Sequence, residues 1–289
     1  DAPIIHIFTS GTTGEPKGVC LPVKALSCIE AYAEFAYDLR QTDIFWNAAD
    51  PGWAYGLYCG ILATLTTGTP AILFEGGFSA QATIDIIEKQ KITNFAAAPT
   101  VYRSLRADGI EISNKHKLRC LSSAGEPLTP EINEWAKSFF GLSVHDHYGQ
   151  TETSMVINNH HHPELKTILR DGSMGKVMPG WSATVLKNDE DVPEKPGIAG
   201  RVAFIIDKSP FSWFAGYISN PKKSAEKFSK DKKYYLTGDT GSVDKDGYFY
   251  FSTRDDDVII MAGYRIGPFE VESALSTHNA VAECAVIAT

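Results

Sequence analysis

The most chemically distinctive part of the sequence is a glycine-rich segment, residues 8–18, that follows the apolar run of residues 4–8. Its eleven residues contain three glycines, four hydroxyl side chains and one lysine, Lys17. Glycine lets the backbone approach phosphate oxygens closely, N–H groups and hydroxyls bind them, and lysine adds positive charge. A Walker A loop would have Lys directly after its second glycine, whereas Glu15 follows Gly14 here. We interpret the segment as a polyphosphate-binding loop; an ordinary glycine-rich turn is the alternative.

A second polar group falls in residues 145–153, at the end of an expected strand. Tyr148 is suited to stack on a base, Thr151 to contact a phosphate, and Glu152 to supply the hard oxygen ligand that Mg²⁺ prefers. This combination predicts a nucleotide site with a metal ion.

Four further residues fit the nucleotide hypothesis. Gly125 and Pro127 could form a flat backbone ledge against a planar ring. Asp239 follows a glycine turn and is suited to accept both hydroxyls of a ribose, which Arg254 could also reach. Taken singly, each has a structural alternative: an ordinary turn, a turn cap or a surface ion pair.

Histidine and cysteine supply the remaining candidates for metal binding. His145, His147 and the run at residues 160–162 form a possible cluster, but a histidine run before Pro163 is more typical of a solvated loop. The five cysteines are scattered and contain no C-x-x-C pair, which indicates free thiols in a reducing compartment.

The elements that must position these residues alternate between apolar runs typical of strands and segments with helical spacing. We expect strands at residues 4–8, 43–48, 71–74, 94–98 and 118–123, and helices at residues 21–40, 55–67, 80–91, 100–108 and 129–140. This order is typical of an α/β fold whose largely parallel sheet is layered with helices on both faces. Ligands of such folds bind beyond the carboxyl ends of the strands, where these motifs fall.

After about residue 171 the pattern changes to short strands separated by turn residues. We expect these strands at residues 183–186, 200–206, 241–243 and 248–251, which indicates a small antiparallel β subdomain. The charged segments 188–195 and 222–233 are expected to be solvated loops or a surface helix.

Composition narrows the class of partner. The chain has 289 residues, 43% of them hydrophobic, and a formal net charge of −8, which argues against a nucleic-acid-binding surface. No apolar run approaches the ~20 residues of a membrane span. The chain begins at Asp1 without a leader, so we expect a fragment of a cytoplasmic protein; a mitochondrial matrix location would require a transit peptide ahead of Asp1.

In order along the chain, these motifs resemble the core motifs of the AMP-forming acyl-adenylate superfamily, which includes acyl-CoA synthetases, luciferases and peptide-synthetase adenylation domains. The resemblance covers nearly the whole chain, through residues 8–18, 125–127, 148–152, 237–239 and 254–266. Short- and medium-chain acyl-CoA synthetases are the most similar members, as judged by residues 46–47, 50–53, 98–100 and 263–268.

The resemblance implies a role in binding ATP, AMP and Mg²⁺ for most of the residues above. The β- and γ-phosphates of ATP would be held by Thr9, Ser10, Gly11, Thr12, Thr13, Gly14 and Lys17. The adenine pocket would be formed by Gly125, Glu126, Pro127, Asp146 and Tyr148. The α-phosphate would contact Thr151, the Mg²⁺ would bind Glu152, and the ribose would be held by Asp239 and Arg254.

The implied reaction has two steps. A carboxylic acid attacks the α-phosphorus of ATP to give an acyl-adenylate and pyrophosphate, and the thiol of coenzyme A then displaces AMP. The catalytic residues would be Lys17, Thr151 and Glu152, which act by positioning and charge neutralisation.

The resemblance also divides the chain. An α/β part that binds nucleotide and acyl group would span residues 1–172, a β-rich part residues 173–255, and the hinge with the start of a truncated α+β lid domain residues 256–289. Asp256 matches the hinge. Gly263 and Arg265 match the loop that reaches the active site during thioester formation. Since the family's late catalytic lysine is not reached, we expect the chain alone to adenylate poorly.

By resemblance, the acyl pocket would be lined by Trp53, Ala54, Tyr55, Ala124 and Gly149. Acetate-specific enzymes carry a tryptophan at the position of Gly149, so glycine predicts a short- or medium-chain or aryl acid larger than acetate. Two alternatives remain: a peptide-synthetase adenylation domain, although residues 53–57 lack the acidic side chain that would hold an amino group, and a nucleotide-binding protein without full catalysis.

Overall fold

The computed structural model describes residues 2–9, 16–113, 115–254, 259–261, 264–276, 278, 281 and 284–287. Five parallel strands carry the first half of the chain: β3 (Phe45–Asn47), β4 (Ala71–Ile72), β5 (Asn94–Ala97), β6 (Cys120–Ala124) and β7 (Val144–Gln150). Their order across the sheet is β4-β3-β5-β6-β7. Every residue of β3, β5 and β6 is buried, as expected for strands covered on both faces. The predicted parallel α/β sheet is confirmed.

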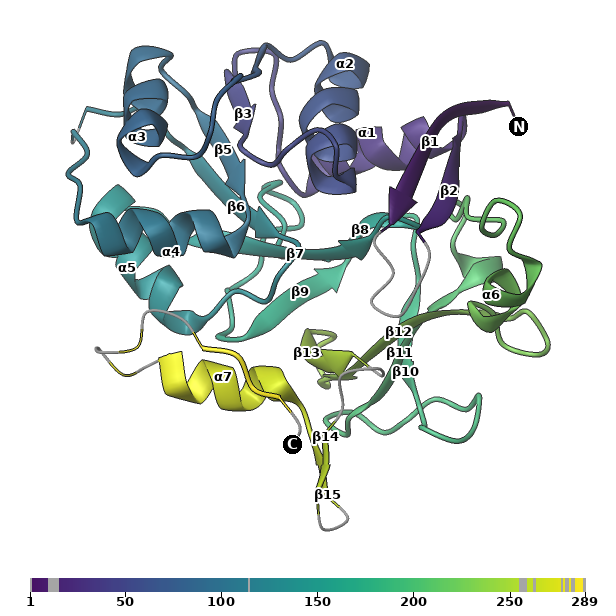
Figure 1. Cartoon of the computed structure of the whole chain (residues 1–289). Coiled ribbons are helices and arrows are strands. Elements are labelled where there is room, and N and C mark those ends of the chain that lie inside the picture. The colour runs from purple at the N-terminus through teal and green to yellow at the C-terminus, as the bar shows by residue number, and fades with distance from the viewer. Residues whose placement is uncertain are drawn as a thin grey trace.

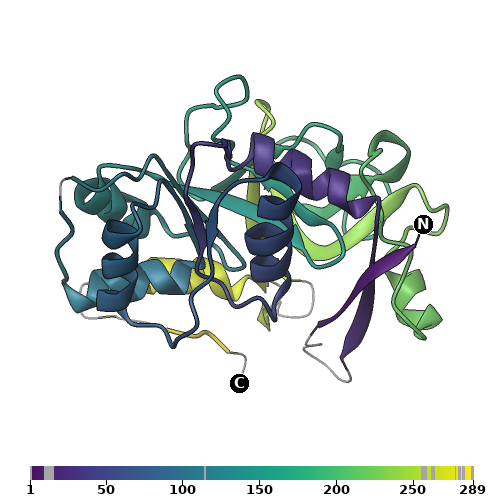
Figure 2. The same cartoon turned by 90° about the horizontal axis from the view of Figure 1, so that it is seen from above.

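Helices lie on both faces of these strands (Figures 1 and 2). Their bounds are α1 (Ala25–Phe35), the π-helix η1 (Tyr55–Leu62), which continues into α2 (Ala63–Thr67), α3 (Ala80–Lys89), α4 (Pro99–Asp108) and α5 (Pro130–Phe140). One buried apolar cluster includes residues of α1 and η1, and another includes residues of α3, α4 and α5. Pro99 and Pro130 open α4 and α5 in the first helical turn, as proline does where its missing N–H costs nothing.

The N-terminal residues form a hairpin, which corrects one prediction. β1 (Pro3–Thr9) pairs antiparallel with β2 (Lys17–Pro22), so the polar loop connects two strands and is not followed directly by a helix. Leu21 is fully buried in β2, and α1 begins only at Ala25. The helix expected from residue 21 was therefore wrong at its start, because the helical spacing of apolar residues begins after Pro22.

The large sheet continues from β7 into six antiparallel strands: β8 (Ser154–Asn158), β9 (Ser173–Val177), β10 (Ala183–Leu186), β11 (Gly200–Ile205), β12 (Tyr234–Val243) and β13 (Phe249–Arg254). Their order is β8-β9-β13-β12-β11-β10. The β-rich second half is confirmed. Since β9 pairs with β8 and with β13, hydrogen bonds of one sheet cross residue 172, and a division of the chain there stays a prediction.

β12 is much longer than the strand expected at residues 241–243. It includes Asp239, so this carboxylate lies inside a strand and does not follow a turn as predicted. Gly238 has a φ of +80°, and the pairing with β11 skips residues between Leu236 and Thr240. The glycine thus marks an irregularity within a strand, which a turn-like sequence does not distinguish from a true turn.

The last described elements are the hairpin of β14 (Ile259–Met261) with β15 (Tyr264–Ile266) and helix α7 (Pro268–Ser276), which contacts β13 (Figure 1). Two short helices, η2 (Ile206–Lys208) and α6 (Pro221–Glu226), lie between β11 and β12. Helix α6 contains no buried residue, as predicted for a surface helix. In the described part of the chain, no helix has the length and apolar character needed to cross a membrane.

Candidate nucleotide and acyl site

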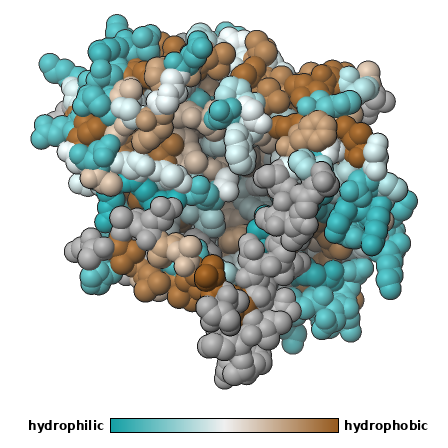
Figure 3. All heavy atoms as spheres, viewed as in Figure 1, coloured by the Kyte–Doolittle hydropathy of each residue, from teal (hydrophilic) through white to brown (hydrophobic). Residues whose placement is uncertain are grey.

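A cavity of about 560 Å³ opens where the carboxyl ends of the parallel strands meet the antiparallel half. The surface is hollowed near the middle of the face shown in Figure 3. The cavity collects most of the predicted site residues: Thr9, Lys17, Trp53, Ala54, Tyr55, Gly125, Glu126, Pro127, Asp146, Tyr148, Gly149, Thr151, Glu152, Asp239 and Arg254. Residues that are up to 245 positions apart in sequence therefore share one space, Thr9 and Arg254 being the extremes.

A few predicted positions are not part of this cavity. Ala124 is fully buried in β6 and does not line it, because its side chain packs in the core. Ser10, Gly11, Thr12, Thr13 and Gly14 lie outside the described residues, as do Asp256 and Gly263. Arg265 lies in β15.

A network of hydrogen bonds holds Asp239 at the cavity wall. Tyr148 donates its hydroxyl to Oδ2 of Asp239, and Gln150 donates to the same oxygen at 2.8 Å. Tyr235 in turn donates to Oε1 of Gln150 at 2.9 Å. Asp239 faces Arg254 in the register of β12 with β13 and is only 6% exposed. The predicted ribose-binding pair is therefore adjacent, with the carboxylate fixed in place before a ligand arrives.

Glu152 is the second buried carboxylate of the cavity, at 7% exposure. Its Oε1 accepts a hydrogen bond of 2.5 Å from Tyr217, and among the described residues no other hydrogen bond reaches this carboxylate. Lys17 lies with its Nζ 5.1 Å from the ring centroid of Tyr217. Oppositely charged groups thus stand at the same end of the cavity, as the coordination of a metal–phosphate complex would require.

Lys227 is a third cation of this wall, alongside Lys17 and Arg254. Its Nζ donates to the carbonyl of Thr237 at 2.7 Å. Burial lowers the pKa of Lys227, although the nearby Glu152 and Asp239 oppose this by favouring the charged ammonium. Lys227 is therefore partly buried, although its segment, residues 222–233, was expected to be a solvated loop or a surface helix. The same segment contains several other lysines, so nothing in composition distinguished Lys227.

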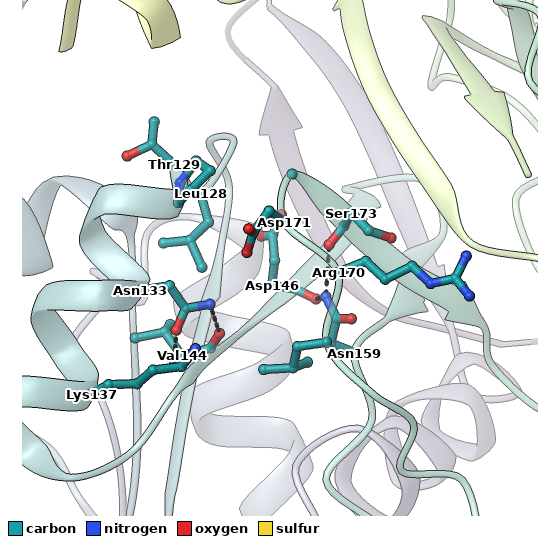
Figure 4. Close-up of a pocket in the computed structure, with 13 residues that line it drawn as sticks. Leu128, Thr129, Asn133, Lys137, Val144, Asp146, Asn159, Arg170, Asp171 and Ser173 are labelled. Carbon is teal, nitrogen blue, oxygen red and sulfur yellow. Dashed lines mark hydrogen bonds between the residues drawn. The ribbon is translucent and has the colours of Figure 1, made fainter. Parts of the chain in front are cut away.

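Asp146 lies between this cavity and a smaller one of about 40 Å³ shown in Figure 4. Its backbone carbonyl accepts from Nδ2 of Asn159 at 3.2 Å, and the same amide group donates to the carbonyl of Ser173 at 2.8 Å. Burial raises the pKa of Asp146 to about 8. This shift favours the protonated carboxyl group, which can donate as well as accept hydrogen bonds.

Residues 125–127, predicted to form a backbone ledge, line the cavity directly after β6. Gly125 has a φ of +97°, a conformation that glycine adopts without strain. The carboxylate of Glu126 accepts hydrogen bonds from Thr100 and Arg103, each with a contact of 2.7 Å, and is thereby attached to α4. The side chain of Glu126 thus attaches residues 125–127 to α4.

Gly149 lines the cavity, but the structure gives another reason for glycine there. A Cβ on this residue would lie 2.0 Å from the carbonyl oxygen of Ser154 and 2.6 Å from Cα of Met155. Even alanine therefore requires β7 and β8 to separate. Glycine at this position is explained by close backbone approach, and the inference from Gly149 to a larger acid was incomplete.

The prediction for the histidines is corrected by the structure. His145, His147, His160 and His161 are all buried, so the run before Pro163 is not a solvated loop. The rings of His145 and His161 stack with centroids 3.6 Å apart. Among the described residues, no group of histidine, cysteine and carboxylate side chains is arranged to hold a metal ion. Backbone N–H groups of His161 and His162 donate to the carbonyls of Ala36 and Phe35 at the end of α1, a tertiary contact that a polar run does not reveal.

The cysteines agree with their sequence-based interpretation. Cys28, Cys59 and Cys120 are buried thiols that form no disulfide, and Cys20 and Cys284 are partly exposed. Burial raises the pKa of Cys28 to about 12 and that of Cys120 to about 11, which makes these thiols unreactive.

Comparison with known proteins gives a consistent result. The family described as AMP-binding enzyme matches residues 1–214. The mitochondrial acyl-coenzyme A synthetase ACSM3 of Rattus norvegicus is 38% identical over 286 residues, which cover 98% of this chain and 48% of that protein. The chain thus spans about half the length of the curated relatives it matches.

Solved structures show the same relationship. An acyl-CoA synthetase of Brucella canis is 47% identical, with a TM-score of 0.81, and the match covers 99% of this chain and 51% of that one. The anthranilate CoA ligase AuaEII, solved in complex with anthranoyl-AMP, is 29% identical with a TM-score of 0.86, covering 98% of this chain and 53% of that one.

Proposed function

Because this chain belongs to the AMP-binding enzyme family, we propose that it forms the nucleotide- and acyl-binding part of an AMP-forming acyl-CoA ligase. Its site would bind ATP and a carboxylic acid, produce an acyl-adenylate, and present this intermediate to coenzyme A. The observation that carries the proposal is the cavity in which Lys17, Glu152 and Asp239 meet. Phosphate, metal and ribose each find a group of suitable chemistry there.

The residues present fit a magnesium–nucleotide complex. Glu152 is a buried carboxylate whose one described hydrogen bond uses Oε1 alone, so it offers the hard oxygen that Mg²⁺ binds. When bound, the ion would neutralise phosphate charge. Lys17 would add a further positive charge beside the phosphates, and Thr151 would contact the α-phosphate.

Asp239 and Arg254 would hold the ribose, because a carboxylate with fixed oxygens can accept hydrogen bonds from both sugar hydroxyls. Gly125, Pro127 and Tyr148 would enclose the adenine. These contacts orient the α-phosphorus toward the acid, and such positioning accounts for much of the rate in phosphoryl and nucleotidyl chemistry. Asp256, Gly263 and Arg265 keep their predicted roles in the hinge and the thioester-forming step.

The acid itself would lie against Trp53, Ala54, Tyr55 and Gly149. Because Gly149 places no side chain at this wall, we propose an acid larger than acetate, either a short- or medium-chain acid or an aryl acid. The relative solved with anthranoyl-AMP shows that an aryl adenylate fits this fold in that protein. Each additional buried methylene would contribute up to ~0.8 kcal/mol.

The proposal is tested by calorimetric titration of the chain with non-hydrolysable acetyl-, butyryl-, octanoyl- and benzoyl-adenylate analogues. We expect binding that strengthens beyond the acetyl compound. Asp239→Asn should weaken binding about tenfold or more, because the ribose loses a charged acceptor. Asp246→Asn is the matched control, since Asp246 is exposed and pairs with Arg170.

Two results would contradict the proposal. One is the absence of binding to every analogue. The other is equal affinity of the Asp239→Asn variant and the unchanged chain, which would show that the ligand does not use this carboxylate.

A further inference from the structure

Tyr217 joins two parts of the site that are distant in sequence. It lies between η2 and α6, forms an isolated antiparallel bridge with Val19 of β2, and is followed by Ile218, whose N–H donates to the carbonyl of Gly18 at 2.8 Å. Figures 1 and 2 both show the segment around α6 beside the β1–β2 hairpin. The backbone at Tyr217 is therefore attached to the strand that begins at Lys17.

The two ends of this side chain make different contacts. The hydroxyl donates to Oε1 of Glu152 at 2.5 Å, and the ring face lies 5.1 Å from Nζ of Lys17. Phe214 packs edge-on against the ring, with centroids 5.1 Å apart, and the residue is 6% exposed. A rigid, buried ring thus fixes the spacing between a carboxylate and an ammonium.

This spacing has a chemical consequence. In the described part of the chain, Lys17 and Glu152 form no direct ion pair with each other. A direct pair would neutralise both groups and withdraw them from a ligand. Tyr217 lies between them: its neutral hydroxyl donates a hydrogen bond to one carboxylate oxygen, and its ring makes a cation–π contact with the ammonium group. Both formal charges are thereby kept available to the cavity.

We infer that Tyr217 is a positioning residue for the metal–nucleotide complex, one that orients Glu152 toward a divalent cation while it holds Lys17 beside the phosphates. The inference rests on the proposed function. Nothing in the sequence singled out Tyr217, because it belongs to no phosphate, ribose or adenine motif. Its contacts with Lys17 of the β1–β2 hairpin and with Glu152 in the turn after β7 are formed only in the folded structure.

The test measures binding of ATP to the full chain by calorimetry, once with Mg²⁺ and once with EDTA. Tyr217→Phe keeps the ring and its packing but removes the hydroxyl. We expect its affinity for ATP to fall about tenfold with Mg²⁺ and less than about twofold with EDTA, because the hydroxyl acts through Glu152. Tyr58→Phe is the matched control: Tyr58 is also buried, and its hydroxyl has no hydrogen-bond partner among the described residues.

A double-mutant cycle separates positioning from a general structural role. Glu152→Gln should lose the Mg²⁺-dependent part of the affinity, and adding Tyr217→Phe should then have little further effect. Additive losses, or an unchanged Mg²⁺ dependence in Tyr217→Phe, would overturn the inference alone. Failure of the unchanged chain to bind ATP under either condition would overturn the proposed function, and the inference with it.

Discussion

At the scale of single residues, the site differs most from its sequence-based description in how its carboxylates are held. Asp239 accepts a hydrogen bond from the hydroxyl of Tyr148, and Glu152 accepts one from the hydroxyl of Tyr217. Asp146 instead lies partly buried between two cavities, and burial raises its pKa to about 8. Three carboxylates of one cavity are thus prepared for different tasks by their surroundings.

The raised pKa of Asp146 predicts a pH-dependent stability. In the unfolded chain this carboxyl titrates near its ordinary value, whereas in the fold it holds its proton to about pH 8. Its contribution to stability is therefore lost as the pH rises from the ordinary value through 8. The side chain of the Asp146→Asn variant cannot ionise, so the variant should not lose this stability. Between pH 6 and 8.5, the free energy of unfolding of the unchanged chain should therefore fall relative to that of the variant by on the order of 1–2 kcal/mol.

Urea unfolding at the two pH values measures this difference. Asp246→Asn provides the comparison, since that side chain is 63% exposed and should show no such trend. A gap between Asp146→Asn and the unchanged chain that stays constant with pH would show that Asp146 is ionised in the fold.

At the scale of elements, the β7–β8 pair sets the shape of the cavity wall. The register shifts between Tyr148 and Gly149, and the backbone of β8 then passes against Gly149. This close approach turns the sequence after Gln150 into the cavity, where Thr151 and Glu152 lie. The shape of the wall thus depends on a residue without a Cβ at position 149.

Gly149→Ala should destabilise the chain by about 2–3 kcal/mol, because a Cβ would lie 2.0 Å from the carbonyl oxygen of Ser154 and the strands would have to separate. The denaturation midpoint in urea measures the loss. Gly77→Ala is the control, since a Cβ there has nothing within 4 Å, and its effect should stay within about 0.5 kcal/mol. Equal stability of both variants would refute the close approach.

Local signals predicted much of the fold. The α/β alternation was readable because Pro99 and Pro130 open helices and each buried strand is a short apolar run. The strand from Lys17 to Pro22 and the full length of β12 were missed because their pairing partners, rather than their own periodicity, make them strands.

The site was predictable to the extent that motifs carry it. Asp239, Arg254 and Glu152 belong to recognisable sequence motifs and share the cavity. Tyr217 and Lys227 were not found, because they act through contacts with residues far away in sequence. Sequence alone gives the groups that touch a ligand more readily than the groups that hold them.

At the scale of the whole molecule, a buried histidine cluster connects the sheet with α1. His147 accepts the Tyr32 hydroxyl at Nδ1, 2.8 Å away, since its Nε2 faces the carbonyl of Asn159. The N–H of His161 donates to the carbonyl of Ala36 at 3.0 Å. The backbone contact of His161 brings the chain after β8 against the first helix, and the hydrogen bond from Tyr32 requires a neutral His147 ring.

Acidification should therefore unfold the molecule through these rings. Burial lowers the pKa of His145 and His160 to about 4 and keeps those of His147 and His161 well below their ordinary value, with Lys166 contributing for His145 and His161. Below the ordinary value of about 6.5 the unfolded chain binds protons that the fold excludes, so stability falls as the pH falls, by about 1.4 kcal/mol per pH unit for each histidine. His160→Leu removes one such group and should reduce the slope of unfolding free energy between pH 6 and 5 by about that amount, whereas replacement of the exposed His6 by glutamine should leave it unchanged. Identical slopes for all three chains would mean that these histidines take up protons within the fold, and that the contact between the sheet and α1 tolerates charge.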